Sequence, residues 1–407
     1  MIVGWVERNE GEKFFGWFSS SEDLVEKHKT LHIFSAGELR WTKKIIIKPS
    51  DRADLASYSN AFIFEFDLGT EDFYQGASTC SIHFKISCAN IGYPLLVTPH
   101  LVSQSVAVAD DLKEGLSFGR VSTDGAAIVG AGGNIFLKQG TNNVEGLYNG
   151  ETVIDTLGWV KTFIARQARA IEKGYQYLQI VIPEKSSVMY WNAPFHATKG
   201  SAGLNDLIQA VENIPEVRKN FICSDDYLPD EVHSEAVFRA FDTHMSTYGT
   251  KLLMDALLDR LMPLHNSFYK LGPVIHGNAP GDIGVRFLED GNITERPPLY
   301  ENLLSENQKT LTPQLIHEFD PVEGNIGIRR SWQCHNAPIK KRVVCFGGSS
   351  FERGEVSSTL SWWCSRLFTE FHFYWSPDYL PEVIDSLSPD LVICQTIERF
   401  LTIVPKS

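Results

Sequence analysis

The chain has 407 residues, of which 43% are hydrophobic and 21% charged, so it is long enough for two or three domains with a sizeable buried core. Lysine and arginine total 37 against 50 aspartates and glutamates, a formal net charge of −13, which argues against nucleic acid and anionic membrane surfaces as partners. Aromatic residues make up 12% of the chain, which argues against disorder and favours ring-lined clefts of the sort that accept sugars or other flat, partly apolar ligands.

The seven cysteines are odd in number and scattered, and no C-x-x-C pair occurs. Cys345 and Cys394 lie inside apolar runs, so the cysteines are predicted to be buried free thiols in a reducing compartment. The first residues, M-I-V-G-W-V-E-R, lack the basic and apolar regions of a signal peptide, and the charge-free run 86–109 is too polar for a membrane span. We therefore expect a cytoplasmic protein with no membrane span.

Residues 1–120 are predicted to form an all-β sandwich domain. Short β-rich stretches at 31–34, 44–48, 61–66 and 80–86 are separated by clusters of glycine, aspartate, serine and asparagine. Their spacing is typical of the strands of a sandwich.

Residues 121–407 are predicted to form an α/β domain. Residues 156–173 carry Trp159, Val160, Phe163, Ile164 and Ile171 at helical spacing, which predicts an amphipathic helix with these side chains buried. The largely apolar run 177–182 predicts a buried strand after it. Further helices are predicted at 206–211 and 247–262.

The remainder of this domain divides into an irregular part and a regular part. Residues 265–338 are rich in proline, glycine and asparagine with no sustained period, which is typical of a lid or functional loop. Strands predicted at 342–346, 370–375 and 391–395 then alternate with helices at 356–368 and 380–387. This alternation predicts a mostly parallel sheet covered on both faces. Ligands bind at the carboxyl ends of such strands, so the loops after Ile182, Phe346 and Gln395 are candidate positions.

The sequence F-G-G-S-S-F at 346–351 directly follows a predicted strand. Gly347 and Gly348 allow a sharp turn that places a serine hydroxyl at the end of the strand, beside backbone N–H groups able to hold an oxyanion. The alternative is an ordinary strand-to-helix turn with serine as a cap. The G-x-S-x-G elbow of α/β-hydrolases is absent, because Phe351 stands two residues after Ser349.

The sequence D-T-H-M-S-T-Y-G at 242–249 precedes a predicted helix. Asp242 and His244 are two residues apart, so the carboxylate is able to hold one imidazole nitrogen and leave the other free as a general base. The alternative is a surface D-x-H at a helix start, where the aspartate favours the helix dipole.

The two motifs together resemble the SGNH-hydrolase-like branch that includes the alginate O-acetyltransferases. That branch carries D-T-H-W-S/T/N followed by glycine, and later G-[DNT]-S-[FY]; here Met245 replaces the tryptophan. Segments at 132–137, 180–185, 389–393 and 398–401 also agree in order, so the resemblance covers about residues 125–403. It implies a three-layer α/β/α domain with a Ser-His-Asp site.

The resemblance leaves two choices for the nucleophile. If Gly347 matches the family glycine, Ser349 is the nucleophile and Gly348 replaces the usual Asp, Asn or Thr. If Phe351 anchors the match instead, Gly348 is the glycine and Ser350 the nucleophile. We prefer Ser349, because the turn geometry depends on where the strand ends.

The resemblance also implies roles for other residues. His244 is the expected general base and Asp242 its orienting partner. The residues expected to contact the substrate or the oxyanion include Gly347, Gly348 and Asn336, the last through its side-chain amide. Arg399, in the matching E-R-x-L segment, is placed in the same group.

The N-terminal region resembles, loosely, β-sandwich modules of bacterial glycan-assembly enzymes. It carries G-W at 4–5 and 16–17, R-A-D-L at 52–55 and F-I-F-E-F at 62–66. These aromatic side chains are expected to lie in the hydrophobic core more often than on a surface that binds sugars.

No metal site and no cofactor are predicted. His265 and His276 lack zinc-site spacing, and no H-E-x-x-H occurs. The G-A-G-G run at 130–133 lacks the full dinucleotide-binding pattern. The acyl donor is left unidentified.

The function these features favour is serine-dependent carbohydrate O-acetyltransfer in bacterial surface polysaccharide biosynthesis, through an acyl-enzyme. The alternatives are a carbohydrate esterase that uses the same residues with water, and a catalytically inactive glycan-binding or assembly protein. The alginate-type relatives work outside the cytoplasm, which conflicts with the expected location. The net charge of −13 counts modestly against a strongly anionic glycan as acceptor.

Overall fold

The computed structural model describes residues 2–10, 13–20, 28–35, 38–49, 61–67, 82–88, 91–97, 119–130, 133–139, 143–228, 237–262, 269–277, 281–290 and 295–406. The R-A-D-L segment 52–55, Gly132 and His265 lie outside these residues. The predicted domain boundary near residue 120 falls beside residues 98–118, which also lie outside them, and stays a prediction.

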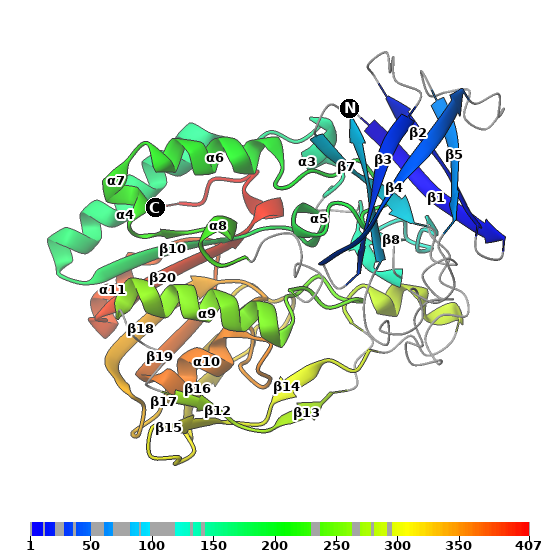
Figure 1. The fold of residues 1–407 in the computed structure, drawn as a ribbon. Coiled ribbons are helices and arrows are strands. Elements are labelled where there is room, and N and C mark those ends of the chain that lie inside the picture. Colours follow the sequence, from blue (N-terminus) through cyan, green and yellow to red (C-terminus); the bar gives the residue numbers. More distant parts are fainter. Residues whose placement is uncertain are drawn as a thin grey trace.

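The N-terminal strands form a closed barrel rather than the predicted sandwich (Figure 1). Their order is β1-β2-β5-β4-β3-β6-β7, and the barrel closes where β1 runs parallel to β7 at Trp5 and Val6. The long β4 pairs with β3 and, at its end, with β5. Strand spacing alone fits a sandwich and a barrel equally, because only the pairing of the outer strands distinguishes them. The bounds are β1 (Ile2–Glu10), β2 (Lys13–Ser20), β3 (His28–Ser35), β4 (Glu38–Pro49), β5 (Ala61–Asp67), β6 (Ile82–Cys88) and β7 (Ile91–Val97).

A seven-stranded, mostly parallel sheet organises the rest of the described chain, as the sequence predicts. Its order is β11-β10-β20-β18-β19-β17-β16; the first five strands are parallel, and β17 and β16 extend them antiparallel. The bounds are β10 (Gln176–Ile182), β11 (Phe221–Ile222), β16 (Gln314–Phe319), β17 (Arg329–Gln333), β18 (Ile339–Gly347), β19 (Phe368–Trp375) and β20 (Leu391–Ile397).

Much of the segment predicted to be irregular, 265–338, is regular structure. It supplies β16 and β17 and two small antiparallel sheets, β12·β15 and β13·β14. The sequence hides β16 because every residue of this edge strand is exposed, so no alternation marks it. It hides β17 because the strand buries the polar Arg330 and Ser331. The further bounds are β12 (Tyr269–Leu271), β13 (Val274–His276), η5 (Gly284–Asp290), β14 (Pro298–Tyr300) and β15 (Leu303–Ser305).

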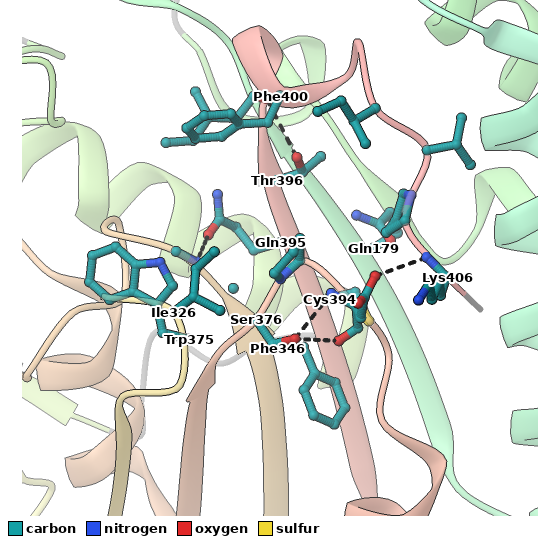
Figure 2. Close-up of a pocket in the computed structure, with 18 of the residues that line it drawn as sticks. Gln179, Ile326, Phe346, Trp375, Ser376, Cys394, Gln395, Thr396, Phe400 and Lys406 are labelled. Atoms are coloured by element: carbon teal, nitrogen blue, oxygen red, sulfur yellow. Dashed lines mark hydrogen bonds between the residues drawn. The ribbon is translucent and has the colours of Figure 1, made fainter. Parts of the chain in front are cut away.

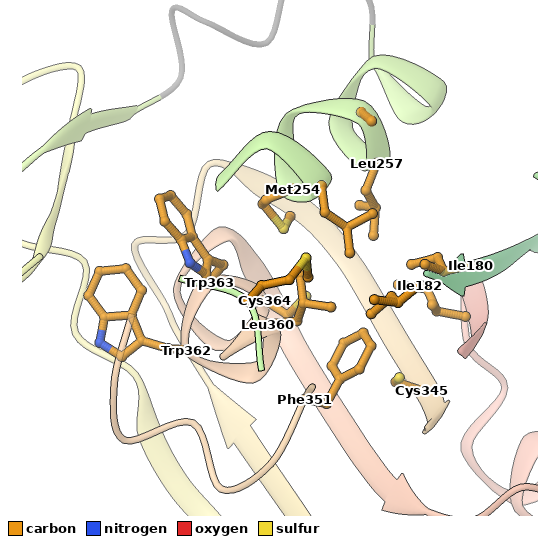
Figure 3. Close-up of a cluster of buried hydrophobic side chains, with 14 of the residues drawn as sticks. Ile180, Ile182, Met254, Leu257, Cys345, Phe351, Leu360, Trp362, Trp363 and Cys364 are labelled. Atoms are coloured by element: carbon orange, nitrogen blue, oxygen red, sulfur yellow. The ribbon is translucent and has the colours of Figure 1, made fainter. Parts of the chain in front are cut away.

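Helices cover both faces of the sheet, which confirms the layered α/β arrangement. α9 (Thr247–Leu261) and α10 (Leu360–Leu367) pack on one face, where Met254 and Trp363 belong to the same buried cluster as Ile180 and Phe351 (Figure 3). α4 (Thr156–Lys173), α6 (Ala202–Glu212) and α11 (Pro381–Leu387) pack on the other. Shorter elements are β8 (Ala127–Val129), β9 (Ile135–Leu137), α3 (Gly146–Asn149), α5 (Lys185–Val188), α7 (Pro215–Arg218), α8 (Ser224–Tyr227) and η6 (Glu398–Phe400).

The buried face of α4 differs in part from the prediction. Trp159, Val160 and Phe163 are buried as predicted, but Ile164 and Ile171 are 45% and 70% exposed. The face turns instead toward Arg166 and Ala170. A helical stripe chosen by hydrophobicity alone does not detect a buried arginine.

Five cysteines that the structure describes, at 223, 334, 345, 364 and 394, are buried and free, which confirms that these positions hold buried free thiols. The reducing compartment stays a prediction. No helix in the described part of the chain is long and apolar enough to cross a membrane.

Candidate functional site

Asp242 and His244 lie at the tip of a tight hairpin that leads into α9. Ser246 N donates to Val237 O at 2.8 Å and closes the hairpin. The Ser246 side chain then caps the first turn of α9. The D-x-H motif therefore sits on a turn fixed at both ends, directly before a helix as predicted.

The segment 281–284 packs directly beneath this turn. Gly281 has φ +76°, and a Cβ at this position would lie 2.0 Å from Phe241 O. Gly284 N donates to the same carbonyl oxygen at 2.9 Å. Gly281 therefore approaches the turn more closely than a residue with a Cβ could, and its backbone supports the turn.

The carboxylate of Asp242 and the imidazole of His244 are hydrogen-bonded. His244 Nδ1 lies 2.6 Å from Asp242 Oδ1, which also accepts the backbone N–H of His244 at 2.9 Å. This contact makes Nδ1 the protonated nitrogen of the neutral ring and leaves a lone pair on Nε2. Nε2 is buried and has no hydrogen-bond partner in the described part of the chain. The imidazole is thus held in the tautomer and orientation that leave Nε2 able to accept a proton.

Three charged residues that sequence reasoning missed surround Asp242. Arg239 Nη1 is 2.5 Å from Asp242 Oδ2, and Arg239 Nη2 is 2.7 Å from Glu295 Oε1. Asp282 donates its backbone N–H to Asp242 Oδ2 at 3.2 Å, and its carboxylate accepts from Thr243 N at 2.7 Å. Arg239 was detectable as a cation three residues before Asp242, whereas Asp282 and Glu295 lie in segments without a pattern.

The neighbouring charges shift the pKa values of Asp242 and His244 in opposite directions. Burial alone would raise the pKa of Asp242, but the hydrogen bond and charge of His244, with the Arg239 guanidinium, hold that pKa well below its usual value. Burial alone would lower the pKa of His244, but Asp242 raises it above the ordinary histidine value. The charges of Asp282 and Glu352 add to this increase.

Asp242, His244 and Asp282 also form a group able to hold a metal ion, since each offers a ligand atom within 4.8 Å of the others. The donor set is better suited to orienting the imidazole. Asp242 Oδ2 is already paired with the Arg239 guanidinium, and a cation here would face that positive charge. His244 Nδ1 is likewise occupied by Asp242.

The two serines follow β18 in a turn, as predicted. The strand ends at Gly347, and Gly348 N donates to Gln395 Oε1 at 2.9 Å. The backbone N–H groups of Ser349 and Ser350 have no acceptor among the residues that the structure describes, so both are available to an oxyanion. The N–H of Gly348 is committed to Gln395 and is not.

The structure keeps both choices of nucleophile open. Ser349 comes two residues after the last residue of β18, as the first match requires. Phe351 is fully buried and stacks on Phe371 and Phe373, as expected if it anchors the second match to Ser350. Both serines are half-buried.

The histidine turn and the serine turn lie on neighbouring segments. Thr247 Oγ1, in the first turn of α9, is 3.4 Å from Ser357 Oγ, in the loop between the serines and α10. His244 Nε2 is hydrogen-bonded to neither Ser349 nor Ser350 in this structure. The chain therefore brings the two segments into contact at Thr247 and Ser357.

Asn336 is not near the serine turn, which corrects its expected role as an oxyanion donor. It is exposed in the turn between β17 and β18, where its Nδ2 donates to Thr310 O at 2.8 Å. β18 has nine residues, at about 3.3 Å per residue, so Asn336 lies roughly 25 Å from the serines, beyond the opposite end of this strand. Asn336 is close to β18 in the sequence, but it precedes the strand and the serines follow it. The length of the strand therefore separates them.

Arg399 has a partner within the protein rather than a free substrate-facing guanidinium. Its Nη1 lies 3.0 Å from Glu184 Oε2, and both side chains are buried. The adjacent Glu398 is fully buried and accepts from Glu184 N at 2.8 Å and from Ser201 N at 2.9 Å. The E-R-x-L segment thus joins the end of β20 to the end of β10. Arg399 therefore holds these two segments in position rather than serving as the expected substrate contact.

Lys185 anchors the hairpin to the sheet. Its buried ammonium group donates to Ile135 O at 2.9 Å and to Arg239 O and Ala240 O at 2.7 Å each. Burial lowers the pKa of Lys185 to about 7, against the opposing charge of Glu295. The lysine of the 180–185 segment therefore holds β9 and the hairpin carrying Asp242 together.

Comparison with known proteins gives only remote structural likeness. No protein-family model and no curated protein matches the chain. PatB1 of Bacillus cereus matches at 8% identity and TM-score 0.43, over 61% of this chain and 92% of its own. The O-acetyltransferase domain of Pseudomonas putida AlgJ matches at 15% and 0.40, over 69% and 93%. Pseudomonas aeruginosa AlgX matches at 12% and 0.36, over 67% and 62%. At these values the assignment of function rests on the residues described above.

Proposed function

We propose that this chain is a serine-dependent carbohydrate O-acetyltransferase of bacterial surface polysaccharide biosynthesis. The observation that carries the proposal is the buried, unpartnered Nε2 of His244, oriented through Nδ1 by Asp242, on a segment next to the serine turn. The order of the two motifs along the chain, which resembles the alginate O-acetyltransferase branch, supports acyl transfer to a sugar.

The proposed reaction has two half-reactions. His244 Nε2 takes the proton of the Ser349 hydroxyl as Oγ attacks the acetyl carbonyl of the donor. The backbone N–H groups of Ser349 and Ser350 hold the oxyanion, and the protonated His244 returns its proton to the leaving group of the donor. A sugar hydroxyl, deprotonated by His244, then attacks the carbonyl of the acetyl-serine. The bond between the acetyl carbon and Ser349 Oγ breaks, the proton held by His244 returns to Oγ, and the acetyl ester remains on the sugar.

The acceptor in this proposal is a cytoplasmic glycan precursor. The five described cysteines are free and buried, which is consistent with a reducing compartment. An esterase would use the same three residues with water in place of the sugar, and the inactive binding protein would use none of them.

A fluorophosphonate that reacts with activated serines tests the proposal, with labelling followed by intact-mass spectrometry. We expect one adduct on the wild-type protein and none on Ser349→Ala or His244→Ala. Ser350→Ala is the matched control, one residue away in the same turn, and should label normally. Loss of labelling in Ser350→Ala with normal labelling of Ser349→Ala would make Ser350 the nucleophile.

Turnover separates the remaining alternatives. We expect the wild-type protein to transfer acetyl from 4-nitrophenyl acetate to an oligosaccharide faster than it releases free acetate. Hydrolysis without transfer would favour the esterase. A protein that neither labels nor turns over the ester would be the inactive glycan-binding form, and the proposal would be wrong.

A further inference from the structure

A cavity of about 570 Å³ lies at the carboxyl ends of three neighbouring parallel strands, β18, β19 and β20 (Figure 2). Gly347 and Gly348 form part of its wall, so the cavity reaches the turn that carries Ser349 and Ser350. The volume falls within the range of small-molecule sites. The transfer of an acetyl group gives this space no role.

The wall of the cavity is mostly apolar. Phe346, Trp375 and Phe400 contribute aromatic rings from three different elements (Figure 2), and Ile326 comes from the loop between β16 and β17. Ile326 and Phe400 are 69% and 46% exposed, so part of this apolar surface is open to a ligand. Such a wall suits a hydrocarbon group and does not suit a nucleotide or a sugar with many hydroxyls.

Polar side chains of the wall are engaged within the protein. Arg166 Nη1 donates to Gln179 Oε1 at 3.2 Å, and Gln395 Oε1 accepts the backbone N–H of Gly348 at 2.9 Å. Arg166 Nε and Gln395 Nε2 have no partner in the described part of the chain, but both atoms are buried and do not open on the cavity. These side chains therefore offer no free donor to an anion, and an uncharged ligand fits the cavity better.

Gly348 leaves the cavity open at the serine turn. Its backbone is not left-handed, so the turn itself does not require glycine at this position. Within 4 Å, a Cβ on Gly348 would meet only Gln395 Oε1 and Trp375 Nε1 among the residues that the structure describes, each at 4.0 Å. A side chain here would therefore point toward two residues of the cavity wall, one position before Ser349. The glycine keeps this space free.

We propose that this cavity holds the hydrocarbon chain of an acyl donor, so that the serine turn accepts acyl groups longer than acetyl. The inference rests on the proposed serine chemistry and extends it to a further class of donor. The steps are unchanged: Ser349 Oγ attacks the acyl carbonyl, the bond from that carbon to the leaving oxygen breaks, and His244 passes the serine proton to the leaving group. The chain on the acyl carbon then lies past Gly348, in the cavity.

Turnover of 4-nitrophenyl acetate and 4-nitrophenyl hexanoate by the full chain tests this inference, with release of 4-nitrophenol as the readout. We expect kcat/KM to be roughly tenfold or more higher for hexanoate, because its acyl group buries four further methylenes at up to about fourfold each. Gly348→Leu should abolish this preference, because its side chain fills the space beside the turn. Gly348→Ala is the matched control, since a Cβ fits there, and should retain the preference.

Ile326→Asp provides a second test on another segment if Gly348→Leu does not fold. It places a charge in the apolar wall, so the preference for hexanoate should be lost. Val322→Asp is the matched control, since Val322 is exposed in the same loop and does not line the cavity, and should keep the wild-type preference.

The outcomes separate this inference from the proposed function. Equal kcat/KM for acetate and hexanoate in the wild-type protein, a preference retained in Gly348→Leu or Ile326→Asp, or equal effects of Ile326→Asp and Val322→Asp would overturn the inference alone. Turnover of neither ester would overturn both.

Discussion

At the scale of single residues, Asp242 acts on His244 in two ways. It accepts from Nδ1 and so selects the tautomer, and its charge raises the pKa of the imidazole. Arg239 keeps the carboxylate ionised by pairing with its other oxygen. The base at Nε2 is therefore well oriented but gives up its proton only at a pH above the ordinary histidine value.

The pH dependence of ester turnover follows from this. His244 must be neutral to accept the serine proton, and its pKa is raised, so kcat/KM should rise with pH through an apparent pKa above about 6.5. Asp242→Asn should lower that apparent pKa and reduce kcat by on the order of 10³-fold or more, because the wrong tautomer becomes accessible. A pH profile with the same apparent pKa in wild type and Asp242→Asn would contradict this role of Asp242.

At the scale of elements, the hairpin carrying Asp242 depends on segments far from it in the chain. Lys185, the first residue of α5, donates hydrogen bonds to the backbone carbonyls of Arg239 and Ala240, and Gly281 packs against Phe241 O. The ends of β10 and β20 are joined in turn by Glu398 and Arg399. Contacts between loops at the ends of the strands therefore position Asp242 and His244.

Gly281→Ala should damage the site through this packing. A Cβ would lie 2.0 Å from Phe241 O, so the hairpin must shift. Gly324→Ala is the matched control, since Gly324 also has a left-handed φ but open space around it, and should cost only about 1 kcal/mol of stability. We expect urea unfolding to show a larger loss for Gly281→Ala, with reduced ester turnover. Equal losses of stability and normal turnover in both variants would show that the contact does not position the site.

Sequence predicted the elements that have a clear pattern. α4, α9 and the parallel strands β10, β18, β19 and β20 are confirmed because they bury apolar side chains in a recognisable pattern, whereas the two-residue β11 was not predicted. β16 was missed because it is exposed throughout, and the buried face of α4 was misplaced because Arg166 is the polar member of it. The neighbours Asp282 and Glu295 could not be found from sequence, since long-range packing alone brings them to Asp242.

At the scale of the whole molecule, the net charge of −13 bears on the acceptor. A negatively charged protein repels an anionic glycan over about 10 Å at 0.1 M salt, and added salt screens this repulsion. The repulsion comes from the charge of the whole molecule rather than from the serine turn.

Transfer to oligosaccharides of different charge should show this preference. With acetyl donor and chain length held constant, KM should be lower for a neutral oligosaccharide than for a uronic-acid oligosaccharide at low salt, and the difference should shrink as salt is added. A preference for the anionic oligosaccharide at low salt, or a difference unaffected by salt, would place the acceptor on a local positive surface instead.

The place of β20 in the sheet has a consequence for how the protein is made. This strand follows all the other strands of the sheet in the chain, yet it lies between β10 and β18 and pairs with both. During synthesis β10 and β18 therefore have no common neighbour until residues 391–397 have left the ribosome, and nascent chains should stay protease-sensitive and inactive until then.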